Sequence, residues 1–155
     1  MFRVYAHSWD GSKFITLRET SLHFPSLRQL MEKGTITTEE IPEIIRQVVK
    51  FVCFLRSRGA YHGQLFAHNL YYADGVIKVD RVDQCKLLTI SPEGYLCYPP
   101  QLSHDDSFLY IDLWSIGILT FQLYMGRKPD ISQLKATTYT PEVPPSAIAF
   151  INGIL

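Results

Sequence analysis

The sequence DLWSIG, residues 112–117, lies in the middle of an apolar run that extends from Phe108 to Tyr124. The run is long enough for a helix of about five turns, and Gly126 follows it as a typical helix terminator. Because it includes Asp112 and several hydroxyl and amide side chains, it is too short and too polar to span a bilayer. We therefore predict a helix buried in the protein core.

A second long helix is predicted upstream, from residue 37 to about Arg58. The sequence TTEE, residues 37–40, has a threonine followed three residues later by a glutamate, which is the pattern of a capping box. Pro42 lies near the first turn, and Gly59 marks the end. The apolar residues recur at helical spacing and nearly encircle this helix, so we expect it to be deeply buried; they are Ile41, Ile44, Ile45, Val48, Val49, Phe51, Val52 and Leu55.

Shorter elements complete the predicted fold. Two β-hairpins are expected, one from residues 3–7 and 13–17, the other from residues 70–72 and 76–79 with the turn at Asp74-Gly75. A short helix with a proline near its first turn should follow Phe24, and a final helix should cover residues 146–155. Residues 84–107 look irregular. The fold class is mainly α with two short β-hairpins, in one domain of residues 1–155.

Composition narrows the function classes. Of the 155 residues, 46% are hydrophobic and 19% charged, as in a folded globular protein. Fifteen basic residues balance fifteen acidic ones, so we expect neither a nucleic-acid nor a membrane partner. Three cysteines without a C-x-x-C pair suggest neither disulfides nor zinc and favour an intracellular, cytoplasmic location. The five histidines lack metal-ligand spacing, so no metal site is expected.

Residues 62–70 read HGQLFAHNL, which resembles the catalytic loop H-R-D-L-x-x-x-N of protein kinases. His62, Leu65 and Asn69 match that pattern at the family's spacing. Further motifs follow in the family's order: IKV (77–79) before the D-F-G position, YPPQ (98–101) at the A-P-E position, DLWSIG on the buried helix, and GRKP (126–129) after it.

The chain thus resembles the C-terminal lobe of a protein kinase over residues 1–155. In that resemblance, residues 1–20 are a remnant of the N-terminal lobe, namely a hairpin and a hinge near Glu19 and Thr20. A fold of the protein kinase-like C-lobe type, classed as α+β, is the expectation.

The resemblance also implies which catalytic residues are replaced. Gln64 stands at the catalytic aspartate, and an amide cannot act as a carboxylate base. Phe66 stands at the phosphate-contacting lysine. Asn69 survives among the metal ligands, and we expect it to hydrogen-bond its own loop. Either Arg81 or, with a shift of one residue, Asp80 occupies the magnesium aspartate position.

No G-x-G-x-x-G sequence occurs, and fewer than twenty residues precede the expected hinge. From these absences we expect a protein without cofactors that is not an enzyme. The residues that fit the family best are structural. Asp112 should accept hydrogen bonds from the backbone around His62 and Gly63, while His62 and Trp114 should lie in the core.

The leading functional hypothesis is a truncated pseudokinase that binds another protein, either a kinase or a peptide segment, and regulates it or acts as a scaffold. Four aromatic residues form the candidate partner surface: Tyr95, Tyr98, Phe108 and Tyr110. Simple core packing is the alternative for these four. Two other functions stay open: an atypical kinase completed by a partner, and a structural subunit of a large assembly.

Overall fold

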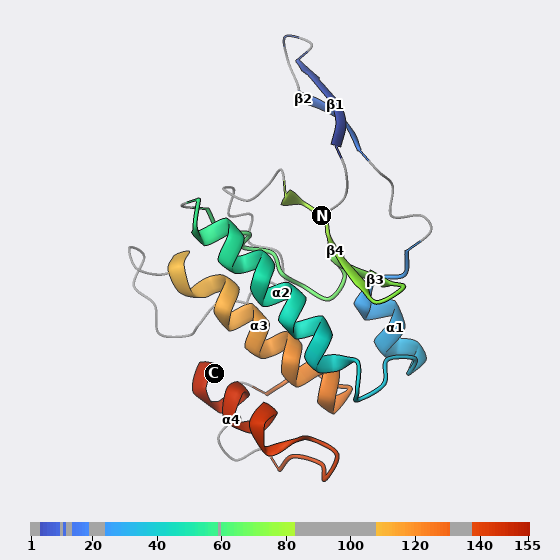
Figure 1. The fold of residues 1–155 in the computed structure, drawn as a ribbon, viewed down its shortest axis with the longest axis vertical. Helices are drawn as coiled ribbons and strands as arrows, with labels where there is room; N and C mark the ends of the chain where they lie inside the picture. The colour runs from blue at the N-terminus through green and yellow to red at the C-terminus, as the bar shows by residue number, and fades with distance from the viewer. Residues whose placement is uncertain are drawn as a thin grey trace.

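A computed structural model describes residues 4–9, 11, 14–18, 24–58, 60–82, 108–130 and 138–155, with the backbone alone described for both strands of the first hairpin and for residues 108–109. The described part is mostly helical and contains two separate two-stranded antiparallel sheets, as predicted (Figure 1). The elements in chain order are β1 (Val4–Trp9), β2 (Phe14–Arg18), α1 (Leu27–Lys33), α2 (Ile41–Arg56), β3 (Leu70–Ala73), β4 (Val76–Val79), α3 (Phe108–Met125) and α4 (Pro145–Ile154).

Helix α3 forms the centre of the helical layer. Figure 1 shows it beside α2, with α4 along its other side, and it contacts both helices. The described side chains from residue 111 to residue 121 are all buried except Leu113, which is half-buried. Gly117 is required for close approach, because a Cβ at this position would lie 2.9 Å from both Ile154 Cγ2 and Leu155 Cδ2. The prediction of a buried helix closed by Gly126 is confirmed.

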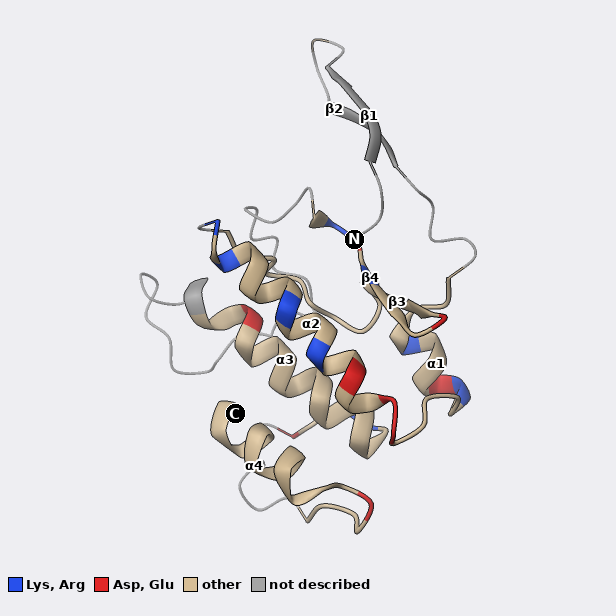
Figure 2. Cartoon of the chain, in the orientation of Figure 1, with Lys and Arg blue, Asp and Glu red and all other residues tan. Residues whose placement is uncertain are grey.

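Helix α2 is buried on one face only, so the prediction that apolar residues would surround it is wrong. The other face carries charge, as the red and blue bands along α2 show in Figure 2. There Glu43 and Arg46 form an ion pair one turn apart. The five fully buried residues keep the i, i+3/i+4 spacing of an amphipathic helix; they are Ile41, Ile44, Val48, Val52 and Leu55.

The start of α2 also differs from the prediction. The helix begins at Ile41, and residues 38–40 form a turn before it. Only half of the expected capping box is present: Thr37 N donates to Glu40 Oε2 at 2.9 Å, but no side chain caps the first turn. This hydrogen bond lowers the pKa of Glu40. The glutamate thus stabilises the preceding turn instead of the helix.

A complete capping box lies instead at α1. The Ser26 hydroxyl accepts from Gln29 N at 3.2 Å, and the Gln29 side chain accepts from Ser26 N at 2.9 Å. Pro25 therefore precedes the N-cap and is not in the first turn. Gly34, at φ 63°, ends the helix in the left-handed conformation.

The β3–β4 hairpin is confirmed and is fastened to α2. Asp74 and Gly75 both have positive φ (53° and 77°), as a tight two-residue turn requires. Gln47 of α2 binds this hairpin through both ends of its amide. Its Nε2 donates to Gly75 O at 2.7 Å, and its Oε1 accepts from Ile77 N at 2.9 Å.

The first hairpin is present with shifted bounds, from Val4–Trp9 to Phe14–Arg18, paired in antiparallel register. It stands apart from the helices in Figure 1. The predicted hinge at Glu19 and Thr20 and the irregular segment 84–107 lie outside the described residues.

Candidate functional site

The site is built on the loop of residues 62–69, which lies between the end of α2 and strand β3. Asp112, in the first turns of α3, holds the start of this loop. Its Oδ2 accepts from His62 N at 2.7 Å and its Oδ1 accepts from Gly63 N at 2.8 Å. The three residues are buried, so the carboxylate finds donors that replace water. The φ of Gly63 is 73°, which only glycine adopts without strain.

The ring of His62 makes the second connection. Its Nε2 lies 2.7 Å from Asp80 O, and Gln64 N donates to its Nδ1 at 3.2 Å. These partners assign the neutral tautomer with hydrogen on Nε2. Burial lowers the pKa of His62, and this effect exceeds the opposite effects of the Asp80 carbonyl and the Asp112 charge. The ring thus joins the loop to the end of β4.

The amide of Asn69 closes the loop from its other end. Asn69 Nδ2 donates to Gln64 O at 2.9 Å, while Asp80 N donates to Asn69 O at 2.9 Å. The side chain of Asn69 is buried, and Gln64 is 8% exposed. The loop therefore has a fixed shape in which a buried amide occupies the position where the resemblance expects a catalytic carboxylate.

Two further replaced positions lie near the surface. The ring of Phe66 stacks on His68, with centroids 5.2 Å apart and planes 16° from parallel. Arg81 is exposed and has φ 55°, an uncommon conformation for a residue with a side chain. Its N–H donates to Asp80 Oδ1 at 2.7 Å. Both alternatives for the magnesium position, Asp80 and Arg81, thus lie beside the loop.

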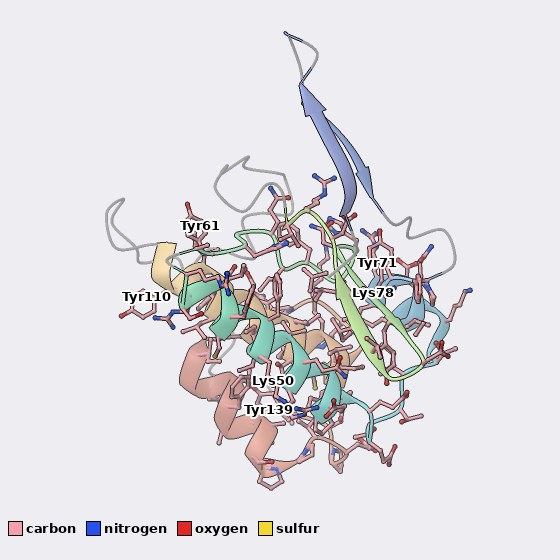
Figure 3. The ribbon with its side chains drawn as sticks, turned by 45° about the horizontal axis from the view of Figure 1, so that its top comes forward. Lys50, Tyr61, Tyr71, Lys78, Tyr110 and Tyr139 are labelled. Atoms are coloured by element: carbon pink, nitrogen blue, oxygen red, sulfur yellow. The ribbon has the colours of Figure 1, made fainter. Side chains whose placement is uncertain are left out.

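The remaining predicted residues are only partly brought together. Trp114 is 5% exposed on α3, within the core. Of the candidate partner surface, Tyr110 is 53% exposed, and Figure 3 shows its side chain pointing away from the helices at the end where Tyr61 also lies. Phe108 is placed in α3 by its backbone, and Tyr95 and Tyr98 lie outside the described residues.

Sequence reasoning missed a cavity of about 230 Å³ between α1, residues 65–68, α3 and the turn after α3. Arg28 lies on its wall, together with Arg127 and Lys128. The sequence signal was the pair of cations next to Gly126, after a helix that has no charge except Asp112.

Within the ranges that the structure covers, no three His, Cys, Asp or Glu side chains are grouped so as to hold a metal ion. In the same ranges, none of the helices combines the length and the apolar character that a membrane crossing needs.

Comparison with known proteins gives a kinase relationship. The serine/threonine-protein kinase STE20 of Debaryomyces hansenii is 26% identical over 142 residues, which is 81% of this chain and 13% of that protein. The calcium/calmodulin-dependent protein kinase type 1 of Macrobrachium nipponense is 27% identical over 65% of this chain and 32% of its own length. The Aurora/IPL1-related protein kinase 2 of Caenorhabditis briggsae is 21% identical over 90% of this chain and 49% of its own length. No protein-family model matches the chain.

These similarities correct one prediction. The expectation that the protein is not an enzyme is wrong, because the proteins that resemble it are named as protein kinases. It rested on Gln64 at the position of the catalytic aspartate and on the absence of a nucleotide-binding lobe from these 155 residues. The chain spans between 13% and 49% of the length of these relatives, so such an absence does not describe a whole protein. Similarity over most of the chain supports a protein with a kinase-like fold.

Proposed function

We propose that this chain is the C-terminal lobe of a kinase-like fold and that it works as a protein-interaction or regulatory module. The observation that carries the proposal is the fixed loop of residues 62–69. Asp112, His62 and Asn69 all use their polar atoms to hold the backbone of this loop or of the neighbouring strand. A partner that binds beside a loop held in one shape loses little affinity to the conformational entropy of ordering that loop.

The partner in this proposal is another protein, either a kinase or a peptide segment. Tyr110 offers an exposed aromatic ring two residues before Asp112, on the helix that anchors the loop. Exposed tyrosines of this kind are enriched in interfaces because the ring buries a large area and the hydroxyl keeps a hydrogen-bond partner.

Affinity capture with purified chain tests this function. Tyr110→Glu places a charge on the expected interface and should abolish capture of a stoichiometric partner. Phe54→Glu is the matched control, because Phe54 is 50% exposed on α2 and its ring contacts the guanidinium of Arg58 in the next turn of the chain. The control should capture the same partner as the wild type. Equal capture by wild type and Tyr110→Glu, or capture of nothing by the wild type, contradicts the proposal.

A second candidate is phosphotransfer, with the rest of the nucleotide site supplied by another protein or by another part of the polypeptide. The kinase names of the relatives favour it. If the described loop contributes to such a site, ATP with Mg²⁺ at about 100 times its dissociation constant should stabilise the active assembly by about 2.7 kcal/mol. A thermal-shift measurement with and without EDTA distinguishes this candidate from the first, since the interaction module requires no nucleotide.

A further inference from the structure

The cavity next to α1 has an apolar floor. Leu65 and Ile118 form part of it and are 1% and 3% exposed, and Met31 of α1 adds a half-buried side chain. Ser115 also lines the cavity, but its hydroxyl already donates to Ile111 O at 2.8 Å within α3. His68 and Gln122 add polar side chains elsewhere in the lining, so it is the floor that favours an apolar group.

The rim of the cavity is basic. Arg28, Arg127 and Lys128 contribute three positive charges, and Glu32 contributes one negative charge, so the lining carries a net charge of +2. The Glu32 carboxylate accepts from Arg28 Nε at 3.0 Å. The net excess therefore lies on the two cations after α3, both of which are exposed.

The geometry of Arg127 leaves its donors available for a ligand. The guanidinium carbon lies 5.4 Å from the centroid of the Phe121 ring, so one face of the group rests against an aromatic surface. A guanidinium in this position still directs its N–H groups outward in its own plane, which suits a carboxylate. Gly126, at φ 63°, makes the turn that brings Arg127 and Lys128 back over the cavity.

Resting on the proposed interaction function, we propose that this cavity binds an acidic segment of a partner protein, with one apolar side chain on the floor and an adjacent carboxylate at Arg127 and Lys128. The volume of about 230 Å³ is below the range of drug-sized ligand sites, about 300–1,000 Å³, and accommodates one large side chain. The even overall balance of fifteen basic and fifteen acidic residues gives no extended field for a nucleic acid.

Glu32 lowers the positive charge of the rim without reversing it. Its carboxylate is paired with Arg28, so Arg127 and Lys128 remain to attract an anion. We assign this anion to the carboxylate of an aspartate or glutamate, which a peptide segment carries next to apolar side chains without any modification.

Selection from a random peptide library on the whole chain is the direct test. The selected peptides should be enriched in aspartate or glutamate next to a leucine, isoleucine, methionine or phenylalanine. The Arg127→Glu/Lys128→Glu double variant should bind the best peptide about tenfold more weakly or worse, and the affinity of the wild type should fall between about 50 and about 300 mM salt. Circular dichroism checks that the variant is folded.

The matched control is Lys33→Glu/Lys50→Glu, which makes the same change in net charge at two exposed positions that do not line the cavity. It should keep the affinity within about twofold. Equal losses in both double variants, or selection of basic or neutral peptides, each overturn the cavity proposal. Peptides or partners that depend on Tyr110 but not on Arg127 and Lys128 also overturn it, while the proposed interaction function stands. The proposed interaction function is contradicted separately, when affinity capture finds no partner whose binding depends on Tyr110.

Discussion

Replacing Asp112 with asparagine should destabilise the protein by about 2 to 4 kcal/mol, because one of its two buried hydrogen bonds is lost and the other loses its charge. The carboxylate accepts from His62 N and Gly63 N at 2.7 and 2.8 Å. An asparagine keeps one acceptor oxygen but turns an NH₂ group toward the other N–H. The weakened bond accounts for about 1 kcal/mol and the unsatisfied buried N–H for about 1 to 3 kcal/mol.

Urea denaturation monitored by tryptophan fluorescence measures this loss, with Asp74→Asn as the matched control. Asp74 is exposed in the β3–β4 turn at φ 53°, where asparagine is equally well tolerated. The control should change the free energy of unfolding by no more than about 0.5 kcal/mol. A loss of 2 to 4 kcal/mol is a large part of the roughly 5–15 kcal/mol typical of a folded protein.

Hydrogen exchange adds a local readout. In Asp112→Asn, the amide protons of His62 and Gly63 should lose more protection than amides in the middle of α2, because these two groups lose their acceptor directly. If Asp112→Asn and Asp74→Asn are equally stable, and the two amides keep their protection, the carboxylate does not hold the loop and the reasoning is refuted.

Three further predictions concern other contacts. Gly117→Ala should lower the free energy of unfolding by about 1 to 3 kcal/mol through overpacking against the end of α4. Gly153→Ala, with nothing within 4 Å of its added Cβ, should leave the stability unchanged or raise it. Thermal unfolding of the two variants tests this difference. Gln47→Glu should lower the free energy of unfolding, measured by urea denaturation, by about 1 to 2 kcal/mol, because a carboxylate oxygen replaces the group that donates to Gly75 O. A variant as stable as the wild type contradicts the role of this hydrogen bond in fastening the hairpin to α2. Burial lowers the pKa of His62 below 6.5, so just below pH 6.5 the unfolded chain binds more protons than the folded one. The free energy of unfolding should therefore be constant above that pH with respect to His62 and fall as the pH drops below it. His62→Asn should reduce this slope when unfolding is measured as a function of pH.

Much of the fold could be predicted from local sequence patterns. Two short runs joined by the Asp74-Gly75 turn were sufficient to predict the β3–β4 hairpin, and the long apolar run before Gly126 was sufficient to predict α3. Helix α2 was misjudged because apolar spacing alone does not distinguish fully buried positions from half-buried ones such as Ile45 and Val49. Which face is covered depends on the neighbours, and these come from distant parts of the chain.

The candidate site, too, could be predicted only in part from the sequence. The contact of Asp112 with the backbone of residues 62 and 63 was expected from the kinase resemblance, and the structure contains it. The link from His62 to the Asp80 carbonyl and the binding of Gln47 to the hairpin were not foreseen, since side chain–backbone contacts leave no periodic signal. The cavity next to α1 joins segments about 100 residues apart, from Arg28 to Lys128, and only the folded structure brings them together.

The Asp112 contact also has a consequence for the order of folding. It joins residues 50 positions apart, so closing it requires α3 to be packed beside α2 first. The loop of residues 62–69 is therefore expected to take its final shape late, after the helices have assembled, and a peptide of residues 60–82 alone should not adopt it. A ligand that recognises this shape would then act as a sensor of the completed helical layer and would not bind nascent chains that end before residue 112.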